Sequence, residues 1–277
     1  MQDRDCAAFL QWALPQLERR WSGYRKVRRL VCKRLAQRLK ALGLADLDAY
    51  RRHLAARPEE WRELDALCGI PVSRFFRDRD IFDALEQEVL PALAETAASR
   101  GAIEAWSAGC ASGEEPYTLA LIWAVRLQPR FAGMGLRIVA TDSDAAVLRR
   151  ARAGCYARSS LKELPGDLRA QGLEERDGTW CIRDRFRVVD FVQQDLREAM
   201  PDGPFDLILC RNVVLTYYAP VLQEALMARI VGRLRPGGAL VVGAHESIPP
   251  GVPDFVAWPG MRTIYRKRPA ERSARWC

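Results

Sequence analysis

Three acidic residues each follow an apolar or Gly-rich segment, at positions where strands of a sheet would end. Glu114 comes after a Gly-rich turn, Asp142 follows the run IVAT, and Asp195 follows FVQQ. A loop that binds pyrophosphate needs bare helix-start amides and basic side chains. Because carboxylates repel phosphate, these residues favour a cationic ligand, such as a sulfonium that also carries an ammonium group.

Two of these acids suit an adenosine group. Asp142, after the second strand, could accept hydrogen bonds from both ribose hydroxyls, a device that NAD-binding proteins share. Asp195 could accept one from the amino group of adenine. A single acid of this kind is more often a helix cap than a ligand contact, but three in succession favour a ligand. Gly109 and Gly113 would let the backbone approach that ligand closely.

A cation and an amide follow another apolar segment. The run FDLIL leads through Cys210 into Arg211 and Asn212. If the run is a strand, both side chains lie at the same edge of the sheet as the acids. The alternative is an ordinary strand end with a turn-forming asparagine.

The elements that must position these residues alternate between strand and helix from residue 103 onward. We expect strands at 103–109, 136–144, 186–196, 205–213 and 239–246. Such alternation predicts a parallel α/β sheet with right-handed crossovers, in which ligands bind beyond the carboxyl ends of the strands. Residues 155–190 interrupt it. Their turn at Asp177 and Gly178 predicts a small antiparallel insertion.

Residues 1–70 are expected to form a small helical module. Apolar residues recur at helical spacing from Tyr24 to Leu42, with Arg and Lys on the intervening face. Gly43 should end that helix, and Asp46 should cap the next one. The basic face would suit an acidic partner, although a solvated helix face would have the same composition.

Composition narrows the class of protein. The chain has 277 residues, of which 49% are hydrophobic and 28% charged, and a formal net charge of +8. This balance is typical of globular proteins. Because no signal-peptide core or membrane-length apolar stretch is present, we expect a cytoplasmic protein without membrane insertion. The eight cysteines form no CxxC pair and only two histidines occur, so we expect reduced thiols and no metal site.

Five motifs occur in order: SRFFR (73–77), WSAGCASGEEPYTLAL (106–121), ATDSDAAVLRRARAGCY (140–156), FDLILCRNV (205–213) and LRPGGALVVGAHE (234–246). Together they resemble the CheR-type methyltransferases, which esterify glutamates of bacterial chemoreceptors with S-adenosylmethionine. The resemblance covers nearly the whole chain. It implies a Rossmann-like class I methyltransferase sheet. It also implies an N-terminal helical domain at 1–78, a methyltransferase domain at 79–277 and a β-subdomain inserted at 155–190.

The resemblance also implies a site. Its cofactor-binding residues would be Ser73, Arg77, Gly109, Glu114, Asp142, Asp195, Leu196, Arg211 and Asn212. Arg77 would hold the acceptor carboxylate, since its planar fork matches carboxylate geometry, and Tyr217 would be the active-site tyrosine. The reaction would be direct displacement, which depends on positioning and charge neutralisation. The basic helix would dock an acidic helix of the target, and the insertion would contact substrate or an adaptor.

Two stretches depart from the family pattern. The family has Asn and Thr where this chain has Pro71 and Ser73. Pro71 lacks both a side-chain amide and a backbone donor, so one cofactor contact is lost or replaced. The family run Arg-Asn-Val-Leu-Ile-Tyr-Phe reads RNVVLTYY here. Either Thr216 replaces the tyrosine, or one added residue brings Tyr217 into its place; we favour the second.

Two other functions would use the same cofactor site. The chain could methylate a small-molecule carboxylate, or it could be a non-catalytic module that binds S-adenosylmethionine. An RNA acceptor is disfavoured, because the basic helix lacks stacking aromatics and no Asn-Pro-Pro-Tyr run is present. We therefore expect a bacterial chemotaxis enzyme that O-methylates protein glutamates, with an acidic chemoreceptor-like helix as its partner and no nucleic-acid partner.

Overall fold

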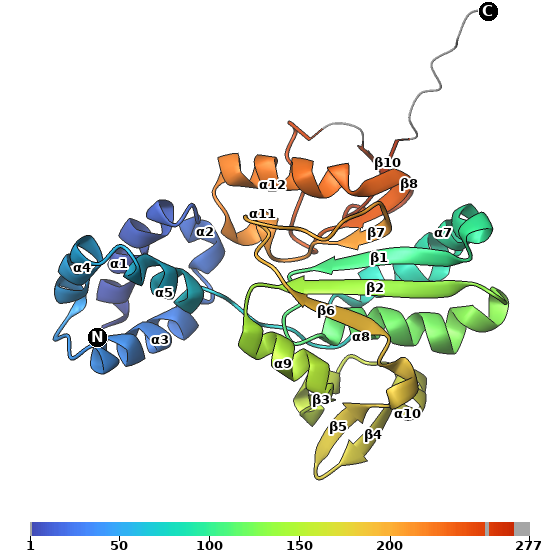
Figure 1. The fold of residues 1–277 in the computed structure, drawn as a ribbon, viewed down its shortest axis with the longest axis horizontal. Coiled ribbons are helices and arrows are strands. Elements are labelled where there is room, and N and C mark those ends of the chain that lie inside the picture. Colours follow the sequence, from blue (N-terminus) through green and yellow to red (C-terminus); the bar gives the residue numbers. More distant parts are fainter. Residues whose placement is uncertain (1, 253–254, 269–277) are drawn as a thin grey trace, which may run out of the picture. The chain divides into compact units, whose positions relative to one another are not determined.

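The computed structural model describes residues 2–252 and 255–268. They form two compact units (Figure 1). The first, here the helical unit, comprises the residues up to Pro71 together with Val214–Gln223. The second, the sheet unit, comprises Val72–Val213 and the residues from Glu224 onward. The short segment after the Arg211-Asn212 pair therefore belongs to the helical unit, although it is far from it in sequence.

The helical unit is built from six helices: α1 (Asp3–Gln16), α2 (Trp21–Tyr24), α3 (Arg28–Ala41), α4 (Leu47–Ala56), α5 (Glu60–Leu67) and α11 (Val214–Tyr217). The helix expected from Tyr24 onward is wrong at its start, because residues 25–27 separate α2 from α3. Contacts between α2 and α11 override the periodicity there. The predicted cap at Asp46 is confirmed, since its side chain accepts from the Ala49 amide at 2.7 Å.

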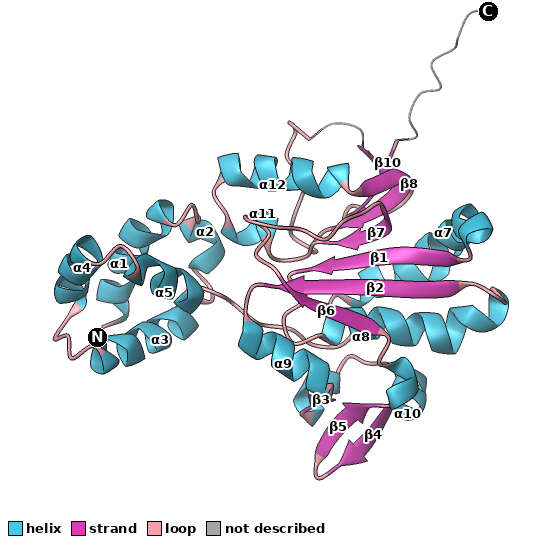
Figure 2. Ribbon diagram, viewed as in Figure 1, coloured by secondary structure: helices cyan, strands magenta, loops and turns pink. Residues whose placement is uncertain are grey.

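The sheet unit contains a seven-stranded sheet in the order β6-β2-β1-β7-β8-β10-β9 (Figure 2). Its strands are β1 (Ala102–Ala108), β2 (Gly135–Asp142), β6 (Val189–Gln193), β7 (Phe205–Leu209), β8 (Leu234–Val241), β9 (Phe255–Ala257) and β10 (Ile264–Lys267). The first five are parallel, as predicted, and β10 and β9 extend β8 antiparallel. The last two were not expected from the sequence.

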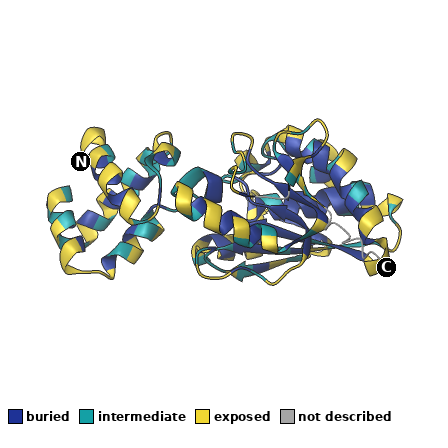
Figure 3. Ribbon diagram, turned by 90° about the horizontal axis from the view of Figure 1, so that it is seen from above, coloured by how far each residue is buried: buried dark blue, intermediate teal, exposed yellow. Residues whose placement is uncertain are grey.

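Helices cover this sheet and bury its strands. Helix α7 (Leu90–Ala97) contacts β1 and β7, α8 (Glu114–Ile122) contacts β2 and β6, and α9 (Ala145–Ala153) also contacts these two strands. Two further helices are α6 (Arg79–Ala84) and α12 (Pro220–Gly232), and α12 belongs to the sheet unit from Glu224 onward. Figure 3 shows buried strands and exposed outer sides of helices. Every residue of β7 is buried, which explains its continuous apolar run.

The predicted insertion is confirmed as a separate antiparallel sheet in the order β3-β5-β4. It consists of β3 (Cys155–Tyr156), β4 (Leu173–Arg176) and β5 (Thr179–Ile182), and α10 (Gly166–Gly172) leads into β4. Asp177 and Gly178 join β4 to β5 with positive φ angles of 48° and 74°. Two positive φ values are what a tight hairpin turn requires. Among the described residues, no helix is both long and apolar enough to span a membrane.

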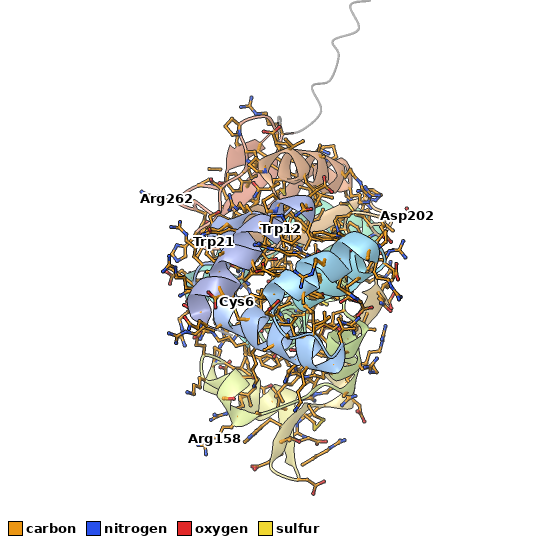
Figure 4. The ribbon with its side chains drawn as sticks, turned by 90° about the vertical axis from the view of Figure 1, so that its left-hand side faces the viewer. Cys6, Trp12, Trp21, Arg158, Asp202 and Arg262 are labelled. Carbon is orange, nitrogen blue, oxygen red and sulfur yellow. A yellow bond between two sulfur atoms is a disulfide. The ribbon has the colours of Figure 1, made fainter. Side chains whose placement is uncertain are left out.

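Two disulfides contradict the expectation of reduced thiols. One joins Cys6 of α1 to Cys32 of α3, with Cα atoms 6.0 Å apart (Cys6 is labelled in Figure 4). The other joins Cys155 of β3 to Cys181 of β5, a directly opposed cross-strand pair. Each pair is 26 residues apart in the chain, so only the fold brings the sulfur atoms together.

Candidate active site

The strand order of the sheet reverses between β1 and β7. From β1 the chain adds β2 and β6 on one side, and then β7 and β8 on the other. The ends of β1 and β7 therefore form the switch point at which open parallel sheets bind ligands. Gly109 follows β1 with a φ of 75°. A Cβ there would lie 2.4 Å from Cγ2 of Val213, just beyond β7, so packing already requires this glycine.

Asp142 ties the Gly-rich turn to the end of β2. Its Oδ2 accepts a hydrogen bond from the Ala111 amide at 2.9 Å, and its Oδ1 accepts one from the Asp144 amide at 3.0 Å. The Thr141 carbonyl accepts two more, from the amides of Gly109 and Cys110. An ionised carboxylate has about four acceptor positions, so capacity for the hydroxyls of a ribose remains.

Burial raises the pKa of Asp142 from its ordinary value, although hydrogen bonds from the Asp144 and Ala111 amides oppose this shift. Its carboxylate is held among backbone groups and is paired with no basic side chain in these hydrogen bonds. A carboxylate held by two backbone amides keeps acceptor positions for hydroxyl donors.

Glu114 begins α8 and is only 1% exposed. The Ser112 hydroxyl lies within hydrogen-bond distance of both carboxylate oxygens, at 3.1 and 2.9 Å. The Tyr156 hydroxyl in turn donates to the Ser112 carbonyl at 2.8 Å. One hydroxyl cannot neutralise a buried carboxylate, so this position suits a cationic ligand group. Gly113 precedes it with a φ of 90°, and a Cβ there would crowd Ala151.

Asp195 follows β6, and its carboxylate is bound by a neighbouring arginine. Arg197 donates to both oxygens, at distances from 2.6 to 3.2 Å, and its amide donates to Oδ1 at 2.9 Å. Both oxygens are thus in use within the protein, so an adenine amino group would share them with Arg197. Leu196 is buried, and its carbonyl accepts from Arg229.

The arginine motif is a loop anchored by two buried phenylalanines. Phe75 packs edge-on against Tyr156, with ring centroids 4.8 Å apart. The Phe76 amide donates to the Thr118 hydroxyl at 3.2 Å, and Phe76 itself has a φ of 57°. Ser73, before the anchors, is partly exposed, and Arg77, after them, donates to the Val72 carbonyl at 3.0 Å. The anchors fix the backbone from which both polar side chains extend.

Arg211 connects this loop to the switch point. Its side chain is 2% exposed and forms ion pairs with Glu115 at 2.9 Å and with Asp78 at 2.8 Å. It also donates to the Arg77 carbonyl at 2.7 Å, and the Ser107 hydroxyl donates to the other oxygen of Glu115. These contacts hold the backbone of the Arg77 turn in place, an arrangement that the sequence did not suggest.

Asn212 adopts a φ of 56° and is held by Glu246. One oxygen of Glu246 accepts from the amides of Asn212 and Gly243, at 2.8 and 2.7 Å. A Cβ on Gly243 would lie 2.8 Å from the Asn212 side-chain oxygen. This carboxylate therefore fixes the backbone after β7 against the backbone after β8.

The remaining candidate residue, Tyr217, lies in the helical unit. It packs against the core of that unit, with its ring centroid 5.1 Å from that of Tyr24. Thr216 accepts a hydrogen bond from Arg20 at its carbonyl, at 3.0 Å. The other nine candidate residues all belong to the sheet unit.

Sequence reasoning missed Thr118, Glu115 and Glu246. A signal existed for Glu246, which follows the apolar run ALVV just as the three chosen acids follow theirs. Thr118 lies one helical turn after Glu114, and its hydroxyl donates to the Glu114 carbonyl at 2.7 Å. Glu115 stands beside Glu114 at the helix start, but its contact with Arg211 had no sequence signal, because the two residues are 96 positions apart. Among the described residues, no cluster of three or more His, Cys, Asp or Glu could hold a metal.

Residues 71–262 match the model of the family described as CheR methyltransferase, SAM binding domain. The chain belongs to the CheR methyltransferase family. A chemotaxis protein methyltransferase of Listeria monocytogenes is 38% identical over 187 residues, which are 67% of this chain and 69% of that protein. Those of Salmonella typhimurium and Escherichia coli are 35% and 33% identical, covering 82% and 79% of this chain and 79% and 77% of theirs. This chain is an S-adenosylmethionine-dependent methyltransferase, built on a mostly parallel, Rossmann-like sheet.

The site's residues fit this cofactor in their chemistry. A buried carboxylate at Glu114 suits the cationic amino-acid end, and a carboxylate with spare acceptor capacity at Asp142 suits a ribose. The turn after β1 is shaped by glycines and backbone hydrogen bonds, and residues 107–116 include Glu114 and Glu115 but no Lys or Arg. Pyrophosphate would require the opposite charge.

Proposed function

We propose that this protein methylates glutamate side chains in an acidic segment of bacterial chemoreceptors, in the cytoplasm, with S-adenosylmethionine as methyl donor. The relatives' name, chemotaxis protein methyltransferase, supports the acceptor class. The observation that carries the proposal is the anchored Arg77 turn. A guanidinium on a backbone fixed by Phe75, Phe76 and Arg211 is suited to holding a carboxylate in one orientation.

In the proposed reaction, a carboxylate oxygen of the glutamate forms a bond to the methyl carbon as the bond from that carbon to sulfur breaks. S-adenosylmethionine supplies the electrophilic methyl group and leaves as S-adenosylhomocysteine, and the product is a glutamyl methyl ester. One negative and one positive charge disappear together, so no strong base is needed. The protein's contribution is alignment, which is worth several orders of magnitude in rate.

Each candidate residue has a role in this proposal. Arg77 orients the acceptor carboxylate, and Tyr217 is the second catalytic residue. The cofactor would be held by the other candidates: Ser73, Gly109, Glu114, Asp142, Asp195, Leu196, Arg211 and Asn212. The structure supports an indirect contribution from Arg211, since both of its terminal nitrogens already have protein partners.

The proposed docking surface for the acidic segment is the exposed basic side of α3. Arg29 and Lys33 are exposed there, one turn apart. Two other basic residues of this helix are engaged within the unit, because Arg28 pairs with Asp3 and Arg38 pairs with Glu60. The surface available to a partner is therefore smaller than the sequence suggested.

A methyl-transfer assay tests the proposal. The cytoplasmic fragment of a chemoreceptor from the same bacterium is incubated with labelled S-adenosylmethionine, and volatile methanol is measured after alkaline treatment. We expect alkali-labile label on the receptor, and at least about a 100-fold loss of turnover in Arg77→Lys, because bidentate geometry is lost. The control is Arg74→Lys on the same loop, since Arg74 is half exposed and pairs with Glu163 at 3.2 Å.

Two outcomes would contradict the proposal. Alkali-stable label, or label found only on a small molecule, would reject glutamate as the acceptor. Normal turnover in Arg77→Lys would reject its role in holding the carboxylate.

A further inference from the structure

The segment that carries Tyr217 is too short to define its own conformation. Helix α11 has only four residues, and a single turn of helix is not stable in isolation, because its nucleation cost is not recovered. The last carbonyls of a helix also need partners from outside its own turns. The position of Tyr217 must therefore be set by contacts from outside α11.

Arg20 of the helical unit supplies those contacts at the C-terminal end of α11. Its Nε donates to the Thr216 carbonyl at 3.0 Å, and its Nη2 donates to the Leu215 carbonyl. A cation at this end of a helix satisfies the orphan carbonyls and complements the helix dipole. Gln223 donates to the Leu215 carbonyl as well, at 3.2 Å.

Backbone pairing around Arg20 holds the same segment. The Arg20 amide donates to the Tyr217 carbonyl at 2.9 Å, and the Ala219 amide donates to the Glu18 carbonyl at 2.7 Å. The two chain segments thus pair as a short antiparallel bridge, although Arg20 and Thr216 are 196 residues apart in sequence.

Gly23 lets the two segments approach each other. A Cβ at this position would lie 2.2 Å from the Thr216 carbonyl oxygen and 3.2 Å from the Tyr217 ring. Its φ is not among the positive values, so the requirement for glycine here comes from this close approach. Any side chain at residue 23 would push α11 away.

We propose that Arg20, with Gly23, is a positioning residue for methyl transfer: it holds α11, and with it the Tyr217 side chain, in one conformation. The inference rests on the proposed function, which assigns Tyr217 to the reaction. It gives the helical unit a second role besides docking the target, because Arg20 of this unit fixes the segment that carries Tyr217.

Kinetics of Arg20→Ala and Arg20→Lys test this inference. We expect kcat for receptor methylation to fall about 10- to 100-fold in Arg20→Ala, on the scale of a small misplacement of a reacting group. KM for S-adenosylmethionine should stay within about twofold. Lysine cannot reproduce two directed bonds to adjacent carbonyls, so Arg20→Lys should recover little. Gly23→Ala should give the same loss of kcat by a different route.

The matched control is Arg34→Ala. Arg34 also donates to two backbone carbonyls of the helical unit, those of Leu67 and Gly69, but not to α11. It should cost similar stability and leave kcat nearly unchanged. A fall in kcat equal to that of Arg20→Ala would overturn the inference, because a general loss of helical-unit stability would then explain both.

A double-mutant cycle with Tyr217→Phe separates positioning from a general structural effect. If Arg20 acts through the Tyr217 hydroxyl, Arg20→Ala should lower kcat by less than about twofold in the Tyr217→Phe background. Fully additive losses would overturn the inference, since independent sites add.

Hydrogen exchange gives a readout that does not need activity. The Ala219 amide should exchange faster in Arg20→Ala and remain protected in Arg34→Ala. If the parent transfers no methyl group to the receptor, the proposed function fails, and exchange alone then decides whether Arg20 holds α11. If the parent is active but Arg20→Ala retains its kcat, the inference fails while the proposed function stands.

Discussion

Replacement of Arg211 by Ala should destabilise the sheet unit strongly. The guanidinium is almost fully buried and forms ion pairs with Glu115 and Asp78. Removing one partner of a buried ion pair costs about 3–5 kcal/mol, because the remaining charge is left buried without compensation. The two carboxylates are 14% and 27% exposed. Water can therefore solvate them in part, so we expect the lower end, about 3 kcal/mol.

Chemical denaturation followed by circular dichroism would measure this loss. A change of about 3 kcal/mol corresponds to a decrease in Tm of roughly 6–12 °C for a unit of this size. The control is Arg137→Ala, because Arg137 is 73% exposed in its pair with Glu104. Exposed pairs contribute little, so its effect should stay below about 0.5 kcal/mol.

The prediction also has a functional part. Arg211 donates to the Arg77 carbonyl, so Arg211→Lys should lower methyl transfer even where the protein stays folded. Lysine keeps the charge but cannot bridge Glu115, Asp78 and that carbonyl with one planar group. If the free energy of unfolding of Arg211→Ala lies within about 1 kcal/mol of that of the parent, the reasoning about this buried cluster is refuted.

Three further outcomes are expected. Asp142→Ala should weaken S-adenosylhomocysteine binding by about 1.5–3 kcal/mol in calorimetry. Burial raises the pKa of Asp142, so the affinity of the parent protein for S-adenosylhomocysteine should fall as the pH decreases through that pKa, at a higher pH than for an exposed aspartate. An unchanged affinity in Asp142→Ala would remove the ribose assignment. Tyr217→Phe should lower turnover about 10- to 100-fold, with Thr216→Val mild, and the reverse ranking would place Thr216 at the family's tyrosine position. Arg29→Glu with Lys33→Glu should weaken receptor binding most at low salt and leave cofactor binding intact; equal receptor kinetics at every salt concentration would leave this face as a solvated surface.

The elements of the sheet unit could be predicted because their signals are local. A parallel strand buried on both faces needs a continuous apolar run, and β7 has one. Helix caps and tight turns depend on residues that are neighbours in sequence, so Asp46 and the Asp177-Gly178 turn were also predicted. The short edge strands β9 and β10 were not, since a few residues carry no clear period.

The sequence predicted which residues belong to the candidate site but not the contacts between them. Carboxylates after successive strands indicate a shared edge, because carboxyl ends of parallel strands lie together. The sequence could not show that Asp195 is bound by Arg197, or that Arg211 is a clamp between Glu115 and Asp78. Those contacts depend on side-chain direction and strand order.

The sequence by itself determined the class of sheet, the antiparallel insertion, the family and the chemistry of the acidic strand ends. Tertiary structure alone decided which distant segments meet. It paired the cysteines, broke the basic helix before Arg28, and assigned residues 214–223 to the helical unit. The physical reason is that periodicity and capping record only near neighbours, whereas the contacts of Arg20 and Arg211 join residues 96 to 196 positions apart, which no local pattern encodes.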